Sequence, residues 1–257
     1  MLIKRVMHFV LQPMPWVQRL EPWLVYGYAV IVPVLSFCMY QGLYLVPADL
    51  VQGECFRIIY VHVPMAFLSL ALYVLLGLCA LLYSTLHIKS ADLCAVCAAA
   101  LGSVATFLAI LTGAIWGKPT WGTWWFWDAR LTSECVLGLM YVGYLATRFQ
   151  LLPSDYAKKV ASLLATLGLI NVPIVHYSVQ WWYTLHQPST LLSTKSTMPI
   201  EMFAPLLGTI VAFMLLFAWM QLHAMIVVHK GRFLQSKVQY GFGQSGVSGA
   251  EYAGDER

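Results

Sequence analysis

The residues with the clearest chemical potential form a short aromatic run in the middle of the chain. Residues 116–130 read WGKPTWGTWWFWDAR, and five of the chain's ten tryptophans fall between positions 116 and 127. Tryptophan is enriched wherever a membrane meets water, but such a belt needs only scattered tryptophans. A concentration in one loop, together with glycine and proline, favours a platform on which a large, flat and apolar ligand can stack.

Two histidines stand in the segments before and after this run. His62 lies in RIIYVHVP (57–64), and His186 lies in WWYTLHQ (181–187). Two imidazoles beside an aromatic platform are what haem needs, since its iron takes axial nitrogen ligands and its macrocycle needs apolar contact. A third histidine, His176, lies about three turns before His186 inside an apolar segment, where hydrogen bonding in helix packing is the simpler interpretation.

Charged residues complete the candidate site. Asp128 directly precedes an apolar segment, so its carboxylate can cap a helix, and a direct role in binding is an equally supported alternative. Arg130 falls in the first turn of that segment, where the helix dipole disfavours a cation. We therefore expect Arg130 to meet an anion, either Glu134 or an acidic group of a ligand. Arg57 and Arg130 are the candidates for binding the two propionates of a haem.

The elements that must hold these residues are membrane helices. Of the 257 residues, 60% are hydrophobic and only 10% are charged, whereas a soluble domain has about 25% charged residues. Lipid offers the backbone no water to bond, so spanning segments must be helices or a closed barrel, and long continuous apolar runs favour helices. We predict an all-α integral membrane protein, a bundle of about six transmembrane helices, at about residues 23–45, 58–86, 93–115, 131–151, 160–180 and 202–229.

Three regions follow from this pattern. We expect an amphipathic interfacial segment at residues 1–22, a six-span membrane domain at 23–229 with the tryptophan-rich loop at 116–130, and a flexible tail at 230–257. Placing both termini in the cytoplasm puts eleven of the 15 lysines and arginines inside and four outside, as the positive-inside rule requires. The tryptophan-rich loop and both candidate ligand histidines then lie on the outer face.

Other functions have weaker support in the residues. The sequence has no basic patch for nucleic acid, no phosphate loop, no nucleophile–base pair and no metal cluster, so we predict neither a conventional enzyme nor a nucleic-acid-binding protein. Cys94 and Cys97 form a C-x-x-C without a following histidine, and packing by small residues is the simpler interpretation. A permease would have charged or broken helices near the bilayer midplane, and the apolar segments carry almost no charge there.

The motifs also resemble those of a known family. Residues 116–134 resemble the WWD signature of haem-handling proteins in cytochrome c biogenesis. Residues 57–64 and 172–187 resemble the CcmC type, the haem exporter protein C family. The resemblance covers nearly the whole chain between residues 20 and 230. It implies a protein of the bacterial inner membrane that binds haem b non-covalently at the periplasmic face.

The resemblance implies the residues of the haem site as well. It makes His62 and His186 the axial ligands of the haem iron, and the choice of His186 over His176 rests on the resemblance more than on spacing. The implied platform comprises Trp121, Gly122, Trp124, Trp125, Trp127 and Asp128, to which we add Trp116, Arg57 and Arg130 as haem-binding residues.

Partners are implied in the same way. The family delivers haem to a CcmE-type haem chaperone and assembles with CcmAB-type ABC transporter subunits and a CcmD-type small membrane protein. The alternative is a b-type cytochrome subunit in electron transfer, which also needs haem between two histidines. In that class the ligands usually lie deeper within helices, and no tryptophan-rich loop is required.

Overall fold

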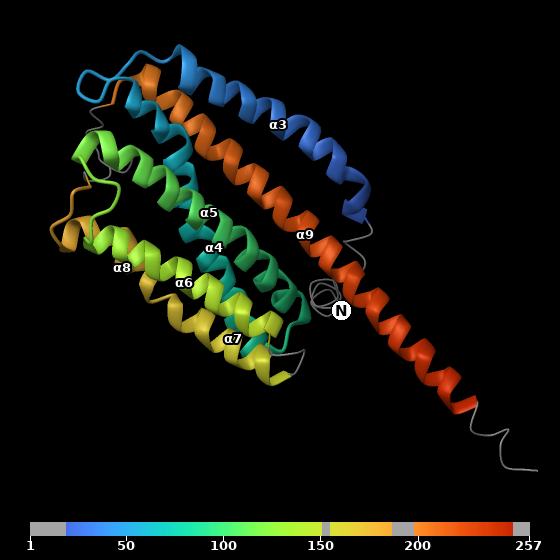
Figure 1. The fold of residues 1–257 in the computed structure, drawn as a ribbon. Helices are drawn as coiled ribbons and strands as arrows, with labels where there is room; N and C mark the ends of the chain where they lie inside the picture. The colour runs from blue at the N-terminus through green and yellow to red at the C-terminus, as the bar shows by residue number, and fades with distance from the viewer. Residues whose placement is uncertain (1–18, 151–154, 187–197, 249–257) are drawn as a thin grey trace, which may run out of the picture.

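The computed structural model describes residues 19–150, 155–186 and 198–248 and shows an all-helical bundle (Figure 1). The predicted fold class is therefore confirmed. The α-helices are α3 (Leu24–Tyr40), α4 (Ile59–Leu86), α5 (Lys89–Trp121), α6 (Ala129–Gln150), α7 (Asp155–Gly168), α8 (Asn171–Trp181) and α9 (Ile200–Ser248). Shorter helical turns are η1 (Glu21–Trp23), η2 (Gln41–Leu45) and η3 (Glu54–Ile58).

Five helical segments among the described residues are long and apolar enough to cross a membrane. They are Glu21–Leu45, Glu54–Leu86, Lys89–Trp121, Tyr156–Trp181 and Ile200–Leu234, and they correspond to five of the six predicted spans. The remaining one is α6, whose 22 residues are long enough to cross at about 1.5 Å per residue. Arg130, Glu134 and Arg148 make α6 less apolar, so its crossing stays a prediction.

The centre of the bundle is the pair α4 and α5. Helices α3 and α9 pack side by side on one flank, and α6, α7 and α8 cover the other (Figure 1). Lipid tails are as apolar as leucine, so helices in a membrane associate through close packing of small residues. The buried face of α5 has this composition, with Ala95, Ala98, Ala99, Gly102, Ala105 and Ala109. A Cβ atom at Gly102 would lie 2.2 Å from the hydroxyl of Tyr141 on α6.

The fifth predicted span is broken rather than continuous. Helix α7 ends at Gly168, and α8 begins at Asn171 after a two-residue turn. Pro173, near the start of α8, has no amide hydrogen to donate to the preceding turn, which accounts for the interruption. The Asn171 side chain donates a 2.9 Å hydrogen bond to the carbonyl of Ser133 on α6. The break therefore packs against α6. It directs α8 toward the loop that precedes α6.

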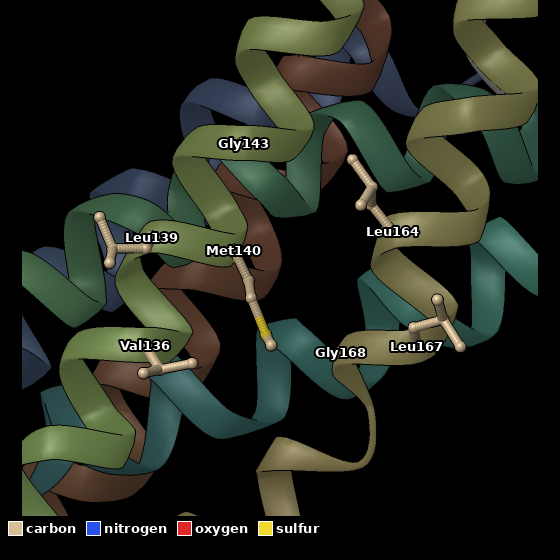
Figure 2. A pocket seen from close by; sticks show the side chains of 7 residues that line it. All are labelled: Val136, Leu139, Met140, Gly143, Leu164, Leu167 and Gly168. Carbon is tan, nitrogen blue, oxygen red and sulfur yellow. The ribbon is translucent and has the colours of Figure 1, made fainter.

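An apolar groove lies beside this break, between α6 and α7 (Figure 2). Its lining residues are Val136, Leu139, Met140, Gly143, Leu164, Leu167 and Gly168. Leu139 and Leu167 are exposed on the surface of the bundle. Because the lining carries no charged side chain, we interpret the groove as a surface that contacts lipid tails.

Helix α9 is longer than its predicted span. It continues as a helix to Ser248, where the sequence led us to expect a flexible tail from residue 230. Residues 1–18, which make up most of the predicted interfacial segment, and residues 249–257 lie outside the described part of the chain. The predicted inner end of the bundle is thus extended by a single projecting helix (Figure 1).

A buried ion cluster joins three helices at the end of the bundle away from the tryptophan-rich loop. Asp92, in the first turn of α5, pairs with Arg148 of α6 at 3.0 Å and with Arg232 of α9 at 3.1 Å. Asp92 and Arg148 are both buried side chains. The negative charge also suits the start of α5, where the helix dipole is positive.

Replacing Asp92 with asparagine is expected to lower the free energy of unfolding by about 3 kcal/mol, because Arg148 would stay buried without its carboxylate. The measurement is unfolding of the purified protein in mixed detergent micelles. Glu21→Gln is the control, because the Glu21–Lys230 pair is largely exposed and should contribute less than about 1 kcal/mol. Equal losses in the two variants would show that burial of the cluster has no special weight.

Candidate functional site

The tryptophan-rich loop is shorter in the structure than the sequence indicated. Helix α5 continues through Trp121, so Trp116 and Trp121 lie on its last two turns. The helix ends at Gly122, whose φ of 79° lies in the left-handed region that glycine adopts most easily. Lys118 closes this end by donating a 3.0 Å hydrogen bond from Nζ to the Gly122 carbonyl. Only residues 122–128 form an extended connection to α6.

Asp128 caps a helix, as its position in the sequence predicted, and it also contacts the segment that carries His186. Its Oδ1 accepts a 2.8 Å hydrogen bond from the amide of Leu131, which caps the start of α6. Its Oδ2 accepts from the amide of Leu185 at 3.2 Å and lies 3.4 Å from Nδ1 of His186. One buried carboxylate therefore starts α6 and holds the segment that follows α8.

His186 is oriented by Asp128 and by a tryptophan of the loop. Its ring meets Trp121 edge-on, with 4.8 Å between the ring centroids. An ionised carboxylate can only accept hydrogen bonds, so Nδ1 of His186 carries the hydrogen and Nε2 keeps its lone pair. Burial lowers the pKa of His186, and the charge of Arg130 adds to this effect while Asp128 opposes it. The ring is therefore neutral at pH 7, the form that binds a metal.

His62 reaches the same chemical form through neutral partners on α5. Its Nδ1 lies 3.1 Å from the carbonyl oxygen of Ala109 and 3.1 Å from the hydroxyl oxygen of Thr112. The Thr112 hydroxyl donates its own hydrogen to Leu108 at 2.6 Å, so it can accept from His62. Nδ1 of His62 is thus the donor, and Nε2 keeps its lone pair.

The tryptophan beside His62 is itself held by a polar contact. Trp116 packs edge-on to His62, with 5.7 Å between ring centroids, and its Nε1 donates a 2.7 Å hydrogen bond to Gln52. Gly113 leaves room for the ring, because a Cβ atom there would lie 3.0 Å from Cε1 of His62. Neither Thr112 nor Gln52 was singled out from the sequence. Thr112 is a polar residue within an apolar run, and that was the available signal.

The structure brings the two candidate ligands into one site. His62 comes from α4 and His186 from the segment after α8, and both rings lie close enough to Arg130 to interact with its charge. Within the described residues, Nε2 of each histidine makes no hydrogen bond. The arrangement thus offers two neutral imidazole nitrogens next to a cation.

The two candidate arginines differ in their surroundings. Arg130 donates a 3.2 Å hydrogen bond from Nη1 to the carbonyl of Val175 on α8, and the charges of Glu134 and Asp128 both act on it. Arg57 pairs with Glu54 and donates to the carbonyl of Gly42 at 3.3 Å. Arg130 is therefore the arginine that shares the site of the two histidines.

The remaining tryptophans of the loop form an exposed aromatic surface. Trp124 and Trp127 are 58% and 72% exposed. Trp125 is half-buried and meets Trp127 edge-on at 5.2 Å. The buried Nε1 of Trp125 has no hydrogen-bond partner among the described residues.

A second aromatic cluster, which we did not predict from the sequence as part of the site, lies at the end of α8. Tyr177 stacks on Trp181 with ring centroids 5.4 Å apart, and Trp182 meets Trp181 edge-on at 5.7 Å. All three side chains are exposed. The signal was the pair of adjacent tryptophans four residues before His186.

His176 has a different environment from His186. It is exposed on α8, and its ring contact in the described structure is with Tyr177, edge-on at 4.6 Å. His186 instead contacts Trp121 and Asp128. Spacing along the sequence did not distinguish the two histidines as candidate ligands, and their surroundings in the structure do.

The fold is that of a multi-pass membrane protein, and comparison with known proteins identifies the family. The family model described as CcmC, heme exporter protein C, matches residues 9–238. The chain belongs to this family, which serves cytochrome c maturation and handles haem without being enzymatic.

Relatives from several organisms support this assignment. Heme exporter protein C of Escherichia coli strain K12 is 42% identical over 204 residues, covering 79% of this chain and 81% of the relative. Heme exporter protein C of Bradyrhizobium diazoefficiens is 40% identical over 208 residues, covering 80% and 78%. A putative cytochrome c biosynthesis ccmC-like mitochondrial protein of Marchantia polymorpha is 41% identical over 171 residues, covering 66% and 72%.

Two substitutions should move the pKa of His186 in opposite directions. Asp128→Asn removes a negative charge that raises the pKa of His186, so the pKa should fall further. Arg130→Gln removes a positive charge that lowers it, so the pKa should rise. The measurement is a pH titration of the His186 ring resonances in histidine-labelled protein. Shifts of the same sign in both variants would rule out this electrostatic arrangement.

Proposed function

We propose that this protein binds haem b at the outer face of the membrane through His62 and His186 and delivers it to a CcmE-type haem chaperone. The observation that carries the proposal is the matched form of the two histidines. Each has Nδ1 held by an acceptor and Nε2 with a free lone pair, and the two come from different parts of the chain. Hydrogen bonding at the far nitrogen is the usual way in which proteins orient a metal-binding imidazole.

The aromatic residues support haem as the cargo. Trp121 and Trp116 hold the two imidazole rings edge-on. Trp124, Trp125 and Trp127, together with Gly122, offer apolar surface for the macrocycle. We add the cluster of Tyr177, Trp181 and Trp182 at the end of α8 as a second wall. No C-x-x-C-H occurs in the sequence, so we propose non-covalent binding.

Arg130 is the proposed partner of one propionate. A guanidinium has five N–H donors, and within the described residues Arg130 uses one nitrogen, Nη1, for a hydrogen bond. The remaining donors suit a carboxylate, which arginine can bind in a bidentate manner. Arg57 is the proposed partner of the second propionate, in exchange for its contact with Glu54.

The proposed location follows the family and the distribution of basic residues. We place the protein in the bacterial inner membrane with both termini in the cytoplasm and the haem site in the periplasm. We further propose a membrane domain at 23–229, flanked by an interfacial segment at 1–22 and a cytoplasmic region from 230. CcmAB-type ABC transporter subunits and a CcmD-type small membrane protein are the proposed assembly partners.

Substituting each ligand should abolish the bis-histidine haem spectrum. His62→Ala and His186→Ala should each lose or alter it, with chaperone loading falling in parallel, because one axial nitrogen is removed. His176→Ala should leave both unchanged, because His176 is not a proposed ligand of the iron and its ring contact is with Tyr177 of the second wall. The measurement is the absorption spectrum of the detergent-purified protein coexpressed with a CcmE-type chaperone.

The possible results separate the competing functions. Normal chaperone loading in both ligand variants would end the proposal. Haem that is retained in all three variants would place the ligands elsewhere. Haem that cycles between oxidation states and never leaves the wild-type protein would favour the b-type cytochrome alternative.

Thr112 should tune the strength of haem binding. Thr112→Val removes one acceptor of the His62 Nδ1–H, and loss of such an outer contact typically weakens metal binding about tenfold or more. Haem titration monitored by absorbance measures the affinity. Thr120→Val is the matched control, because within the described part of the chain the Thr120 hydroxyl bonds only to carbonyls of its own helix. An unchanged affinity in Thr112→Val would show that Ala109 alone orients His62.

A further inference from the structure

A buried carboxyl group lies near Arg130 of the candidate site and takes no part in the proposed ligation of the haem iron. Glu134 is on α6, one helical turn after Arg130, and is only 8% exposed. Its Oε1 has no hydrogen-bond partner among the described residues. An ionisable residue inside a membrane protein is costly to keep and usually marks a functional position.

Several groups surround the Glu134 carboxyl. Ser69 on α4 contacts it. Tyr141 on α6 lies near enough to interact with it, and Tyr73 on α4 packs edge-on against Tyr141 at 4.8 Å. On the side of α8, Asn171 is a neutral amide that bonds to the backbone of α6. Among the described groups whose charge acts on Glu134, Arg130 is the cation that balances it.

Arg130 is thus shared between Glu134 and the candidate haem site. Asp128 already acts on the same guanidinium. A propionate of haem would add a further carboxylate to the one cation. Carboxylates that share a low-dielectric site cannot all stay ionised, and one of them takes up a proton instead.

We propose that Glu134 binds a proton from the outer aqueous phase when a haem propionate occupies Arg130, and returns the proton when haem leaves. The inference rests on the proposed function. The step moves one proton onto a carboxylate oxygen and transfers no electrons. Asp128 is unsuited to this role because its two oxygens already accept from backbone amides, whereas Oε1 of Glu134 has no such donor.

Such coupling would give haem release a chemical driving force. If loaded protein holds one more proton than free protein, haem affinity falls as pH rises through the range in which the two states differ. A proton acceptor in the incoming chaperone, or a less acidic outer phase, would then favour unloading. The bound proton therefore acts as a second ligand whose loss weakens the first.

The test is the pH dependence of the haem dissociation constant for the full chain in detergent micelles, from about pH 7 to about pH 9. Burial lowers the pKa of His186, so this ring stays neutral across the range. Uptake of one proton predicts that the dissociation constant rises about tenfold per pH unit in wild type. Glu134→Gln should bind haem with no such slope, because an amide cannot titrate. Glu201→Gln, an exposed carboxyl at the start of α9, should behave as wild type.

Two further measurements keep the outcome decisive. Haem with both propionates esterified should show no slope in wild type, because it presents no carboxylate to Arg130. The infrared difference spectrum between haem-loaded and haem-free wild type should gain the band of a protonated carboxylic acid, which tests the idea even if Glu134→Gln folds poorly. An equal slope in Glu134→Gln, or no new band, would overturn the role of Glu134 while leaving haem binding intact. Wild type that binds no haem would overturn the proposed function itself.

Discussion

The end of the bundle that carries the tryptophan-rich loop depends on one buried carboxylate. Asp128 accepts the Leu131 amide at the start of α6 and, with its other oxygen, faces the Leu185 amide and the His186 ring. A buried carboxylate must have donors, since an unsatisfied one is costly in an apolar environment. Moving the loop, the helix start or the histidine would take away one of those donors. The three parts therefore hold one arrangement before any ligand arrives, which is what preorganisation of a binding site requires.

The two candidate ligands reach the same tautomer through different partners, and the difference has chemical consequences. His62 donates to a carbonyl and a hydroxyl on the neighbouring helix, whereas His186 donates to a carboxylate. A carboxylate partner raises the basicity of an imidazole more than a neutral acceptor does. The two sides of a bound iron would thus meet nitrogens of unequal donor strength. The weaker nitrogen belongs to a rigid helix, and the stronger one to a segment that Asp128 holds in place.

The membrane bundle can be predicted from the sequence, because long apolar runs leave few alternatives. The details that shape the site cannot be predicted in this way. Lys118 and Pro119 suggest that α5 stops near residue 115, yet proline is tolerated near a helix end and α5 continues through Trp121. Pro173 falls within an apolar run, so the break after α7 is invisible to hydropathy. His62 and His186 could be named from their motifs. Their acceptors could not, because contacts between helices leave no fixed spacing along the chain.

The charges of the site are largely balanced within the protein, and this limits how firmly it can hold an anionic cargo. Arg57 is paired with Glu54, and Arg130 is shared by Asp128 and Glu134. A carboxylate that arrives at either arginine must compete with an existing partner, so only part of the new attraction appears as affinity. A site with unpaired arginines would bind haem more tightly and release it more slowly, since differences in affinity mostly appear in the dissociation rate. This internal balance of charge at the two arginines is consistent with the proposed delivery of haem, because delivery requires that the bound haem can leave.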